Sequence, residues 1–252
     1  MTYYTISRMV IDASREELIE IFRWLQFQGD IESNPTTILI GGWAVYSYNK
    51  WHGSVDIDLV TNNKTRQKLM WYLRNKRKFV HQRDSLAPTT VAKIIPNGKI
   101  LIDFGSREDI CKFEGRDEQC PFSLLDDRIE ARDIGAGFPV IVPEQTLLLI
   151  FKLKAAWDRS FRIQKGLSSN EELEKSKLRK DRADILALID PDVVGTEIDI
   201  QYLGERLREF SFLVELLKEI PDYLDSINMY RRMNQNEARD FIEKLLLRTG
   251  IS

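Results

Sequence analysis

Three aspartates on short apolar segments are the residues of this chain best suited to chemistry. Asp56 and Asp58 lie two apart in the alternating run 55–60, so on a strand both carboxylates point to one face while the residues between them enter the core. Adjacent carboxylates on a half-buried strand repel one another and lose hydration. A divalent cation removes both penalties, and Mg²⁺ favours carboxylate together with phosphate oxygens. The pair therefore predicts a magnesium site; the alternative is an exposed edge strand with solvated acids.

The third aspartate, Asp103, interrupts the apolar segment 100–104, which begins just after Asn97-Gly98, the strongest short hairpin signal in the chain. If this strand pairs beside the Asp56 strand, three carboxylates converge at one end of a sheet. Three acids can bridge two metal ions, which clamp the attacking and leaving oxygens of a phosphoryl displacement. One of the acids can also take the proton from the attacking hydroxyl. On its own, Asp103 is more typical of an edge strand.

A pair of glycines, Gly41-Gly42, separates a short β-branched run, 36–40, from a helical pattern over 43–49. Glycines at such a junction let backbone N–H groups approach a ligand closely. The start of the helix that follows favours an anion at the same place. A plain tight turn is the alternative for a Gly-Gly pair taken alone.

These pieces together resemble a known superfamily. Gly41-Gly42, 13 intervening residues, Asp56-Ile-Asp58 and a later third acid are similar to the minimal nucleotidyltransferase pattern of the polymerase-beta-like superfamily. The sequences Gly-Gly-Trp-Ala-Val and Ser-Val-Asp-Ile-Asp-Leu are most similar to the branch with the AbiEii-type toxins and related small nucleotidyltransferases. The resemblance covers about residues 36–190. Three further segments follow in the order of that branch: Pro143-Glu144, residues 152–159 and Lys180–Asp184.

The resemblance implies a role for each acid and glycine. Asp56 and Asp58 would hold Mg²⁺, with Mn²⁺ as the alternative ion, and the triphosphate. Asp103 would share the metal and act as the base. The residues expected to contact the nucleotide phosphates are Gly41, Gly42 and Ser54.

Charged residues of the second half complete the expected nucleotide site. Lys152 would offset triphosphate charge, and Asp181 would be a site residue or an orienting partner for Lys152. Arg159, seven residues after Lys152, returns to the same helix face, where it reaches phosphate or pairs with an acid. Asp184 either shares the site or bonds the backbone in the core.

The implied activity is transfer of a nucleoside monophosphate from an NTP, such as ATP, to an acceptor hydroxyl, with release of pyrophosphate. The acceptor is left open among RNA or tRNA, a protein and a small molecule. The alternative function is a low-turnover nucleotide-binding or toxin–antitoxin interaction module with an antitoxin-like partner.

The elements that must position these residues predict an α/β (α+β) fold: a small mixed sheet with flanking helices and a helical C-terminal part. We expect an α/β core over 1–142 and a helical region over 143–252 that contributes to the active-site cleft. Ser14 and Glu17 form a capping-box pattern before a helix to about Gln28. The remaining expected elements are a helix over 64–76, hairpins over 90–105 and 131–142, a helix from 143 to about 159, a polar loop over 164–175 and helices after 176.

The amino-acid composition limits which other classes of protein the chain can belong to. Thirty-seven basic and 39 acidic residues give a net charge of −2, which argues against a protein that coats nucleic acid but allows a local basic patch. The run Arg74–Lys78 is either a solvated helix end or a guide for an RNA or acidic acceptor. Two cysteines and two histidines favour neither a disulfide framework nor structural zinc and suit the cytoplasm. Neither a signal peptide nor a membrane span is expected.

Overall fold

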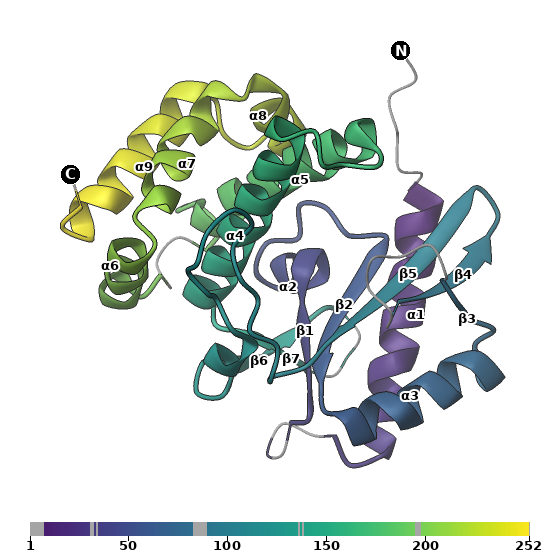
Figure 1. Cartoon of the computed structure of the whole chain (residues 1–252). Helices are drawn as coiled ribbons and strands as arrows, with labels where there is room; N and C mark the ends of the chain where they lie inside the picture. The colour runs from purple at the N-terminus through teal and green to yellow at the C-terminus, as the bar shows by residue number, and fades with distance from the viewer. Residues whose placement is uncertain are drawn as a thin grey trace. The chain divides into compact units, whose positions relative to one another are not determined.

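The computed structural model describes residues 8–30, 33, 35–82, 90–135, 137, 139–194 and 198–251. Its contacts divide the chain into two compact units. The first unit comprises residues 1–109 and 121–143, and the second comprises residues 110–120 and 144–252. The chain therefore returns to the first unit after a short excursion over 110–120. The class is mixed α/β: the first unit holds the sheets and the second holds most of the helices (Figure 1).

The first unit is built on a five-stranded mixed sheet with the order β1-β2-β5-β4-β3. Its β2 and β5 strands pair in parallel, and the other neighbours pair antiparallel. Apolar residues alternate along β2 and β5, which buries one face of each strand. The strands are β1 (Thr37–Ile40), β2 (Asp56–Thr61), β3 (Val80–His81), β4 (Val91–Ile95) and β5 (Gly98–Gly105).

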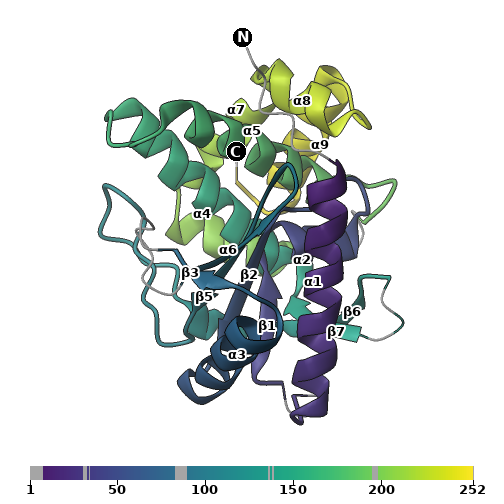
Figure 2. The same cartoon turned by 90° about the vertical axis from the view of Figure 1, so that its right-hand side faces the viewer.

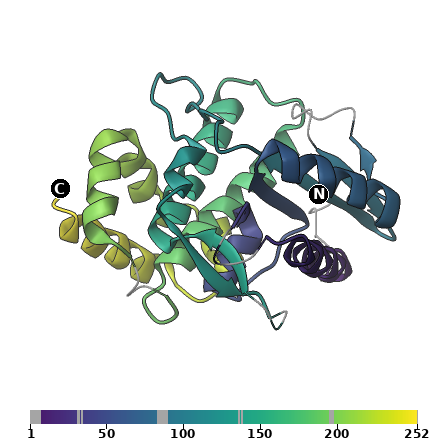
Figure 3. The same ribbon diagram turned by 90° about the horizontal axis from the view of Figure 1, so that it is seen from below.

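Two helices, α1 (Arg8–Phe27) and α3 (Asn63–Lys76), lie side by side on one face of this sheet (Figures 2 and 3). Trp24 of α1 stacks on Tyr72 of α3 with ring centroids 4.8 Å apart. The amphipathic pattern over 64–76 predicts Leu69, Tyr72 and Leu73 on the inward face: Leu69 and Leu73 are fully buried, and Tyr72 is half-buried. The helix layer thus shields the apolar face of the sheet from water.

The helix α2 (Gly41–Tyr48) and a second sheet complete the first unit. The second sheet pairs β6 (Ile129–Asp133) with β7 (Pro139–Pro143) antiparallel, after the short 3₁₀ helix η1 (Phe122–Leu125). The predicted hairpin over 131–142 is confirmed, although residues 136 and 138 of its turn lie outside the described residues. The hydroxyl of Tyr48 donates to the Pro143 carbonyl at 2.7 Å, which ties α2 to this small sheet.

Among its described residues, the second unit consists of helices, the loops that connect them and one isolated bridge, Lys112↔Gln119. Its longest helices, α4 and α5, pack against each other. Phe113 contacts Phe210 and Phe212, with centroids 4.9 and 5.0 Å away, so an aromatic cluster holds residues 110–120 on the helices. The elements are α4 (Gln145–Gln164), α5 (Glu171–Ile189), α6 (Ile200–Glu209), α7 (Phe212–Glu219), η2 (Ile220–Asp222), α8 (Leu224–Tyr230) and α9 (Gln235–Arg248). Within the described ranges, no helix is long and apolar enough to cross a membrane.

Two local predictions are wrong. The predicted loop over 164–175 is too long: the connection covers only 165–170, because α4 runs to Gln164 and α5 begins at Glu171. The Asn170 side chain caps α5 by accepting from the Leu173 N–H at 3.0 Å. The hairpin over 90–105 is confirmed, but its turn residues are Pro96 and Asn97 rather than Asn97-Gly98, since Ile95 pairs with Gly98. Asn97 takes the positive φ of +67°, which asparagine tolerates better than most residues.

The predicted capping box at Ser14 is also wrong. The α1 helix is already formed at Arg8, so Ser14 and Glu17 lie inside it on its buried face. Ser14 accepts a hydrogen bond from the Trp43 indole N–H at 3.1 Å, and Glu17 pairs with Arg77 at 2.9 Å and Lys93 at 2.6 Å. Two polar residues three positions apart lie on the same helix face. This spacing therefore fits both a capping box at the start of a helix and a buried polar pair within one.

Ser14→Ala is expected to destabilise the protein by about 1–3 kcal/mol, because the buried Trp43 indole N–H loses its acceptor. Urea denaturation measures the difference. Ser169→Ala, at an exposed turn, is the matched control and should change the free energy of unfolding by no more than about 0.5 kcal/mol. Equal effects of the two substitutions would contradict the role assigned to this hydrogen bond.

Candidate carboxylate site and buried charge network

The two acidic strands lie side by side, which is the condition for three carboxylates to converge. Asp58 of β2 and Asp103 of β5 are partners in the parallel register, and partners in neighbouring strands point to the same face at a strand spacing of about 4.8 Å. Asp56 lies two residues before Asp58 and therefore shares that face. All three side chains are half-buried. The sheet thus gathers three carboxylates from two adjacent strands.

The acids lie on the face that turns away from α1. A Cβ added to Gly98 would lie 2.9 Å from a methyl carbon of Val10 in α1. The even-numbered residues of β5, which lie on the same face as Gly98, therefore face that helix. Ile100 and Ile102 lie on this face of β5 and are fully buried. Asp103, an odd-numbered residue of the same strand, lies on the opposite face and points away from α1. One strand can therefore serve the core and the carboxylate site at once.

Asp103 has a partner that the sequence did not single out. The hydroxyl of Thr90, just before β4, donates a hydrogen bond to the Asp103 carboxylate. Thr90 is 3% exposed, so this bond holds the carboxylate in a defined orientation without help from bulk water. The position of Thr90 at the start of a strand is shared by many threonines, and the sequence contains no signal that distinguishes it.

Gly41 is required to be glycine at the carboxylate site. Its φ is +70°, and a Cβ at this position would lie 1.9 Å from Oδ2 of Asp58 and 2.8 Å from its Cγ. The helix α2 begins at Gly41 itself, two residues earlier than expected. The first N–H groups of a helix have no partner within it and favour an anion. The Gly41–Gly42 turn therefore puts the start of α2 against the Asp58 carboxylate.

Carboxylate oxygens are the ligands that Mg²⁺ and Mn²⁺ prefer, so the donor set of Asp56, Asp58 and Asp103 fits the expected ion. Within the described part of the chain, no three His, Cys, Asp or Glu side chains stand close enough together to be recognised as a ready-made metal-binding group. Ser54 is half-buried two residues before β2. The backbone pairing of β2 with β5 holds the main chain of all three acids in place.

The remaining predicted site residues belong to the second unit and form a buried charge network. The Lys152 ammonium on α4 lies 3.1 Å from Oδ1 of Asp181 and 2.7 Å from Oδ2 of Asp184, both on α5. The ion pair of Lys152 with Asp181 is the contact expected of an orienting partner, one of the two roles predicted for Asp181. Lys180 also binds Asp184, at 2.9 Å. Asp184 is fully buried, and these two ammonium groups explain how its charge is accommodated.

Arg159 returns to the face of Lys152 as predicted and pairs with an acid. Its Nε lies 2.7 Å from Oδ2 of Asp181, and its Nη1 lies 3.1 Å from Glu174. Burial alone would raise the pKa of the Asp181 carboxyl, but the charges of Lys152 and Arg159 outweigh burial and lower it to about 2. Asp181 therefore stays ionised and joins two cations of α4 to α5.

Gly41→Ala is expected to destabilise the protein by about 2 kcal/mol more than Gly29→Ala, because only the first adds a clash to the strained φ. Gly29 has a φ of +86° and open space around its Cβ position. Urea denaturation gives both values. In an Asp58→Ala background most of this extra cost should disappear, because only the Cβ of residue 58, at 3.1 Å, still lies close. A double-mutant cycle that shows no coupling between the two positions would contradict the contact.

Asp181 should make stability fall in acid. Its pKa is lowered to about 2 in the folded protein, against about 3.9 in an unfolded chain, so its contribution is complete above pH 4 and is lost as the pH falls toward 2. Between pH 5 and pH 2 the protein should therefore lose about 2 kcal/mol more stability than its Asp181→Asn variant does. Asp240→Asn, on an exposed position of α9, should lose as much as the unmodified protein.

Comparison with known proteins adds nothing to this picture: no protein-family model matches the chain, and no curated protein sequence is significantly similar to it. The likeness to the polymerase-beta-like superfamily accordingly rests on the Gly41-Gly42 turn, the acidic strands and the ordered segments of the second half, and it stays a prediction.

Proposed function

We propose that the chain is a metal-dependent nucleotidyltransferase that moves a nucleoside monophosphate from an NTP to an acceptor hydroxyl. The observation that supports this most is the register of β2 and β5, in which Asp58 and Asp103 are side-by-side partners and Asp56 shares their face. The tight approach of Gly41 to the Asp58 carboxylate is the second support. A purely structural sheet has no need of three half-buried acids on one face.

Each residue has a task in this proposal. Asp56 and Asp58 hold Mg²⁺, which when bound offsets the charge of the triphosphate. The backbone N–H groups at the start of α2, at Gly41 and Gly42, bind phosphate oxygens, and Ser54 donates a further hydrogen bond. Asp103, oriented by Thr90, accepts the proton of the acceptor hydroxyl. The acceptor oxygen then bonds to the α-phosphorus, and the bond to the β-phosphate breaks, so that pyrophosphate leaves with the electron pair.

The buried network around Lys152 does not carry the proposal. Lys152 already has Asp181 and Asp184 as partners, so its charge is balanced within its own unit. Its expected action on the triphosphate stays a prediction from the family resemblance. The proposal therefore depends on the first unit alone, and variants of the three acids are sufficient to test it.

Titration calorimetry of the protein with each of the four NTPs, with and without Mg²⁺, tests the site. We expect one or more NTPs to bind only with Mg²⁺, and Asp58→Asn to weaken binding by about tenfold or more because a metal ligand is lost. Asp12→Asn, on the exposed surface of α1, is the matched control and should bind as the unmodified protein does. Metal-independent binding, or equal binding by both variants, would refute the proposal.

Release of pyrophosphate separates transfer from simple binding. In the presence of an RNA and protein mixture as the source of acceptors, we expect pyrophosphate to form, and Asp103→Asn to lower the rate by about 10²–10⁴-fold while NTP binding is kept. Tight Mg²⁺-dependent NTP binding without pyrophosphate would favour the alternative function, a low-turnover nucleotide-binding or interaction module.

A further inference from the structure

The exposed side of α3 carries a concentration of positive charge unlike the rest of the chain. Residues 63–78, which cover α3 and the two residues after it, contain seven lysines and arginines and neither aspartate nor glutamate. The chain as a whole has a net charge of −2, so this excess is local. Six of these cations have no ion-pair partner among the described residues: Lys64, Arg66, Lys68, Arg74, Lys76 and Lys78.

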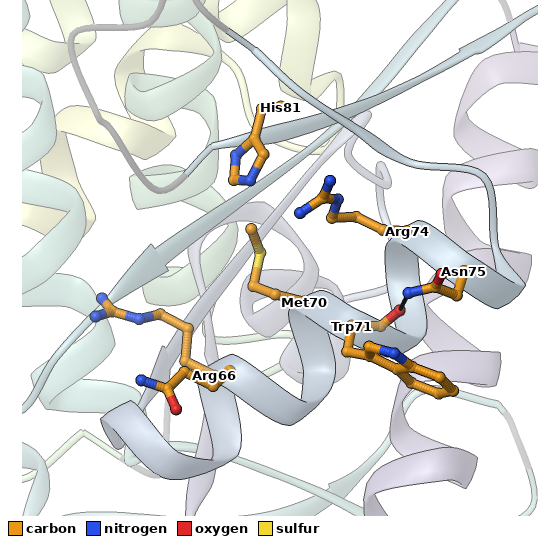
Figure 4. A pocket seen from close by; sticks show the side chains of 7 residues that line it. Arg66, Met70, Trp71, Arg74, Asn75 and His81 are labelled. Carbon is orange, nitrogen blue, oxygen red and sulfur yellow. Dashed lines mark hydrogen bonds between the residues drawn. The ribbon is translucent and has the colours of Figure 1, made fainter.

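A hollow of about 260 Å³ lies within this basic surface. Figure 4 shows Met70, Arg74 and His81 pointing toward one another above the helix, with Arg66 one helical turn before Met70. Arg66 donates to Asn63 at 2.6 Å, which leaves its remaining guanidinium donors for a ligand. His81 belongs to β3, the edge strand of the sheet. Helix and edge strand thus form one shallow surface.

An aromatic ring lies at the margin of the hollow. Trp71 of α3 is 58% exposed, and the side-chain amide of Asn75 donates to its backbone carbonyl at 2.8 Å. A large apolar ring in water costs free energy without benefit to the fold. The core tryptophan Trp43, by contrast, is 1% exposed. Trp71 is therefore available as a platform for a flat ligand group.

We propose that this surface, formed by Arg66, Met70, Trp71, Arg74 and His81, binds single-stranded nucleic acid, with phosphates on the arginines and a base stacked on Trp71. Unpaired cations complement a polyphosphate backbone, and an exposed indole complements an unstacked base. An anionic membrane would be served by the same cations, but it would need an apolar stripe wider than Trp71 and Met70 offer. The surface lies on the helix layer, away from the carboxylate face, so this inference goes beyond the proposed function.

Fluorescence anisotropy with a labelled single-stranded RNA of 20 nucleotides tests the proposal on the full chain. We expect binding that weakens with salt, and a loss of about tenfold in Trp71→Ala, because base stacking is removed, with recovery in Trp71→Phe. Phe27→Ala removes another aromatic ring of the first unit, 86% exposed, and should bind as the unmodified protein does. Equal losses in Trp71→Ala and Phe27→Ala would overturn the stacking contact.

The salt dependence tests the phosphate contacts. In Arg66→Gln/Arg74→Gln the slope of log affinity against log salt should become shallower by about 1.4, since each phosphate contact to a single strand contributes about 0.7. Lys165→Gln/Lys244→Gln, two exposed cations of the second unit, should leave the slope unchanged. Absence of RNA binding at low salt, or binding to phosphatidylserine vesicles in place of RNA, would overturn the proposal.

The Asp58→Asn variant keeps the two proposals apart. It lacks a ligand of the proposed metal site but retains the whole α3 surface, so it should bind the RNA at least as tightly as the unmodified protein. Loss of RNA binding in this variant would contradict the proposal that the α3 surface binds RNA independently of the carboxylate site. Conversely, failure of NTP binding in the unmodified protein would leave the RNA result unaffected.

Discussion

The parallel pairing of β2 with β5 is the constraint on which the carboxylate site depends. It makes Asp58 and Asp103 partners, although they are 45 positions apart in the chain. A shift of one residue would turn every side chain of β5 to the opposite face. The buried residues Ile100 and Ile102 prevent such a shift, because they would leave the helix layer and enter the polar face. Hydrophobic burial thus fixes the geometry of the acids.

A second constraint acts at the start of α2, where the backbone of Gly41 lies directly against the Asp58 side chain. The Asp58 carboxylate fills the space that a Cβ of residue 41 would need, and the φ of +70° is one that glycine adopts without strain. This close approach of the backbone to a carboxylate restricts residue 41 to glycine and fixes the path of the chain. The half-buried acids and this turn are therefore parts of one arrangement.

The second unit solves a different electrostatic problem. Asp181 and Asp184 lie buried on α5, and each is matched by cations from α4 or from its own helix. Breaking such a network leaves an uncompensated buried charge, whereas the intact network contributes less than its Coulomb energy suggests. The network joins α4 to α5 in one register. Six cations of residues 63–78, by contrast, have no ion-pair partner among the described residues, and this difference is what supports the proposed nucleic-acid surface.

The sequence by itself determined the elements whose periodicity is strong: α3 with Leu69 and Leu73 inward, both hairpins, and the alternation that puts Asp56 and Asp58 on one face. It could not decide whether Ser14 caps a helix or lies buried within one, since both fit the same spacing. Only the tertiary structure decided that Asp103 neighbours Asp58, that Thr90 orients Asp103 and that Trp71 stays exposed while Trp43 is buried. These outcomes depend on contacts between residues distant in the chain, whereas periodicity reports only the faces of one element at a time.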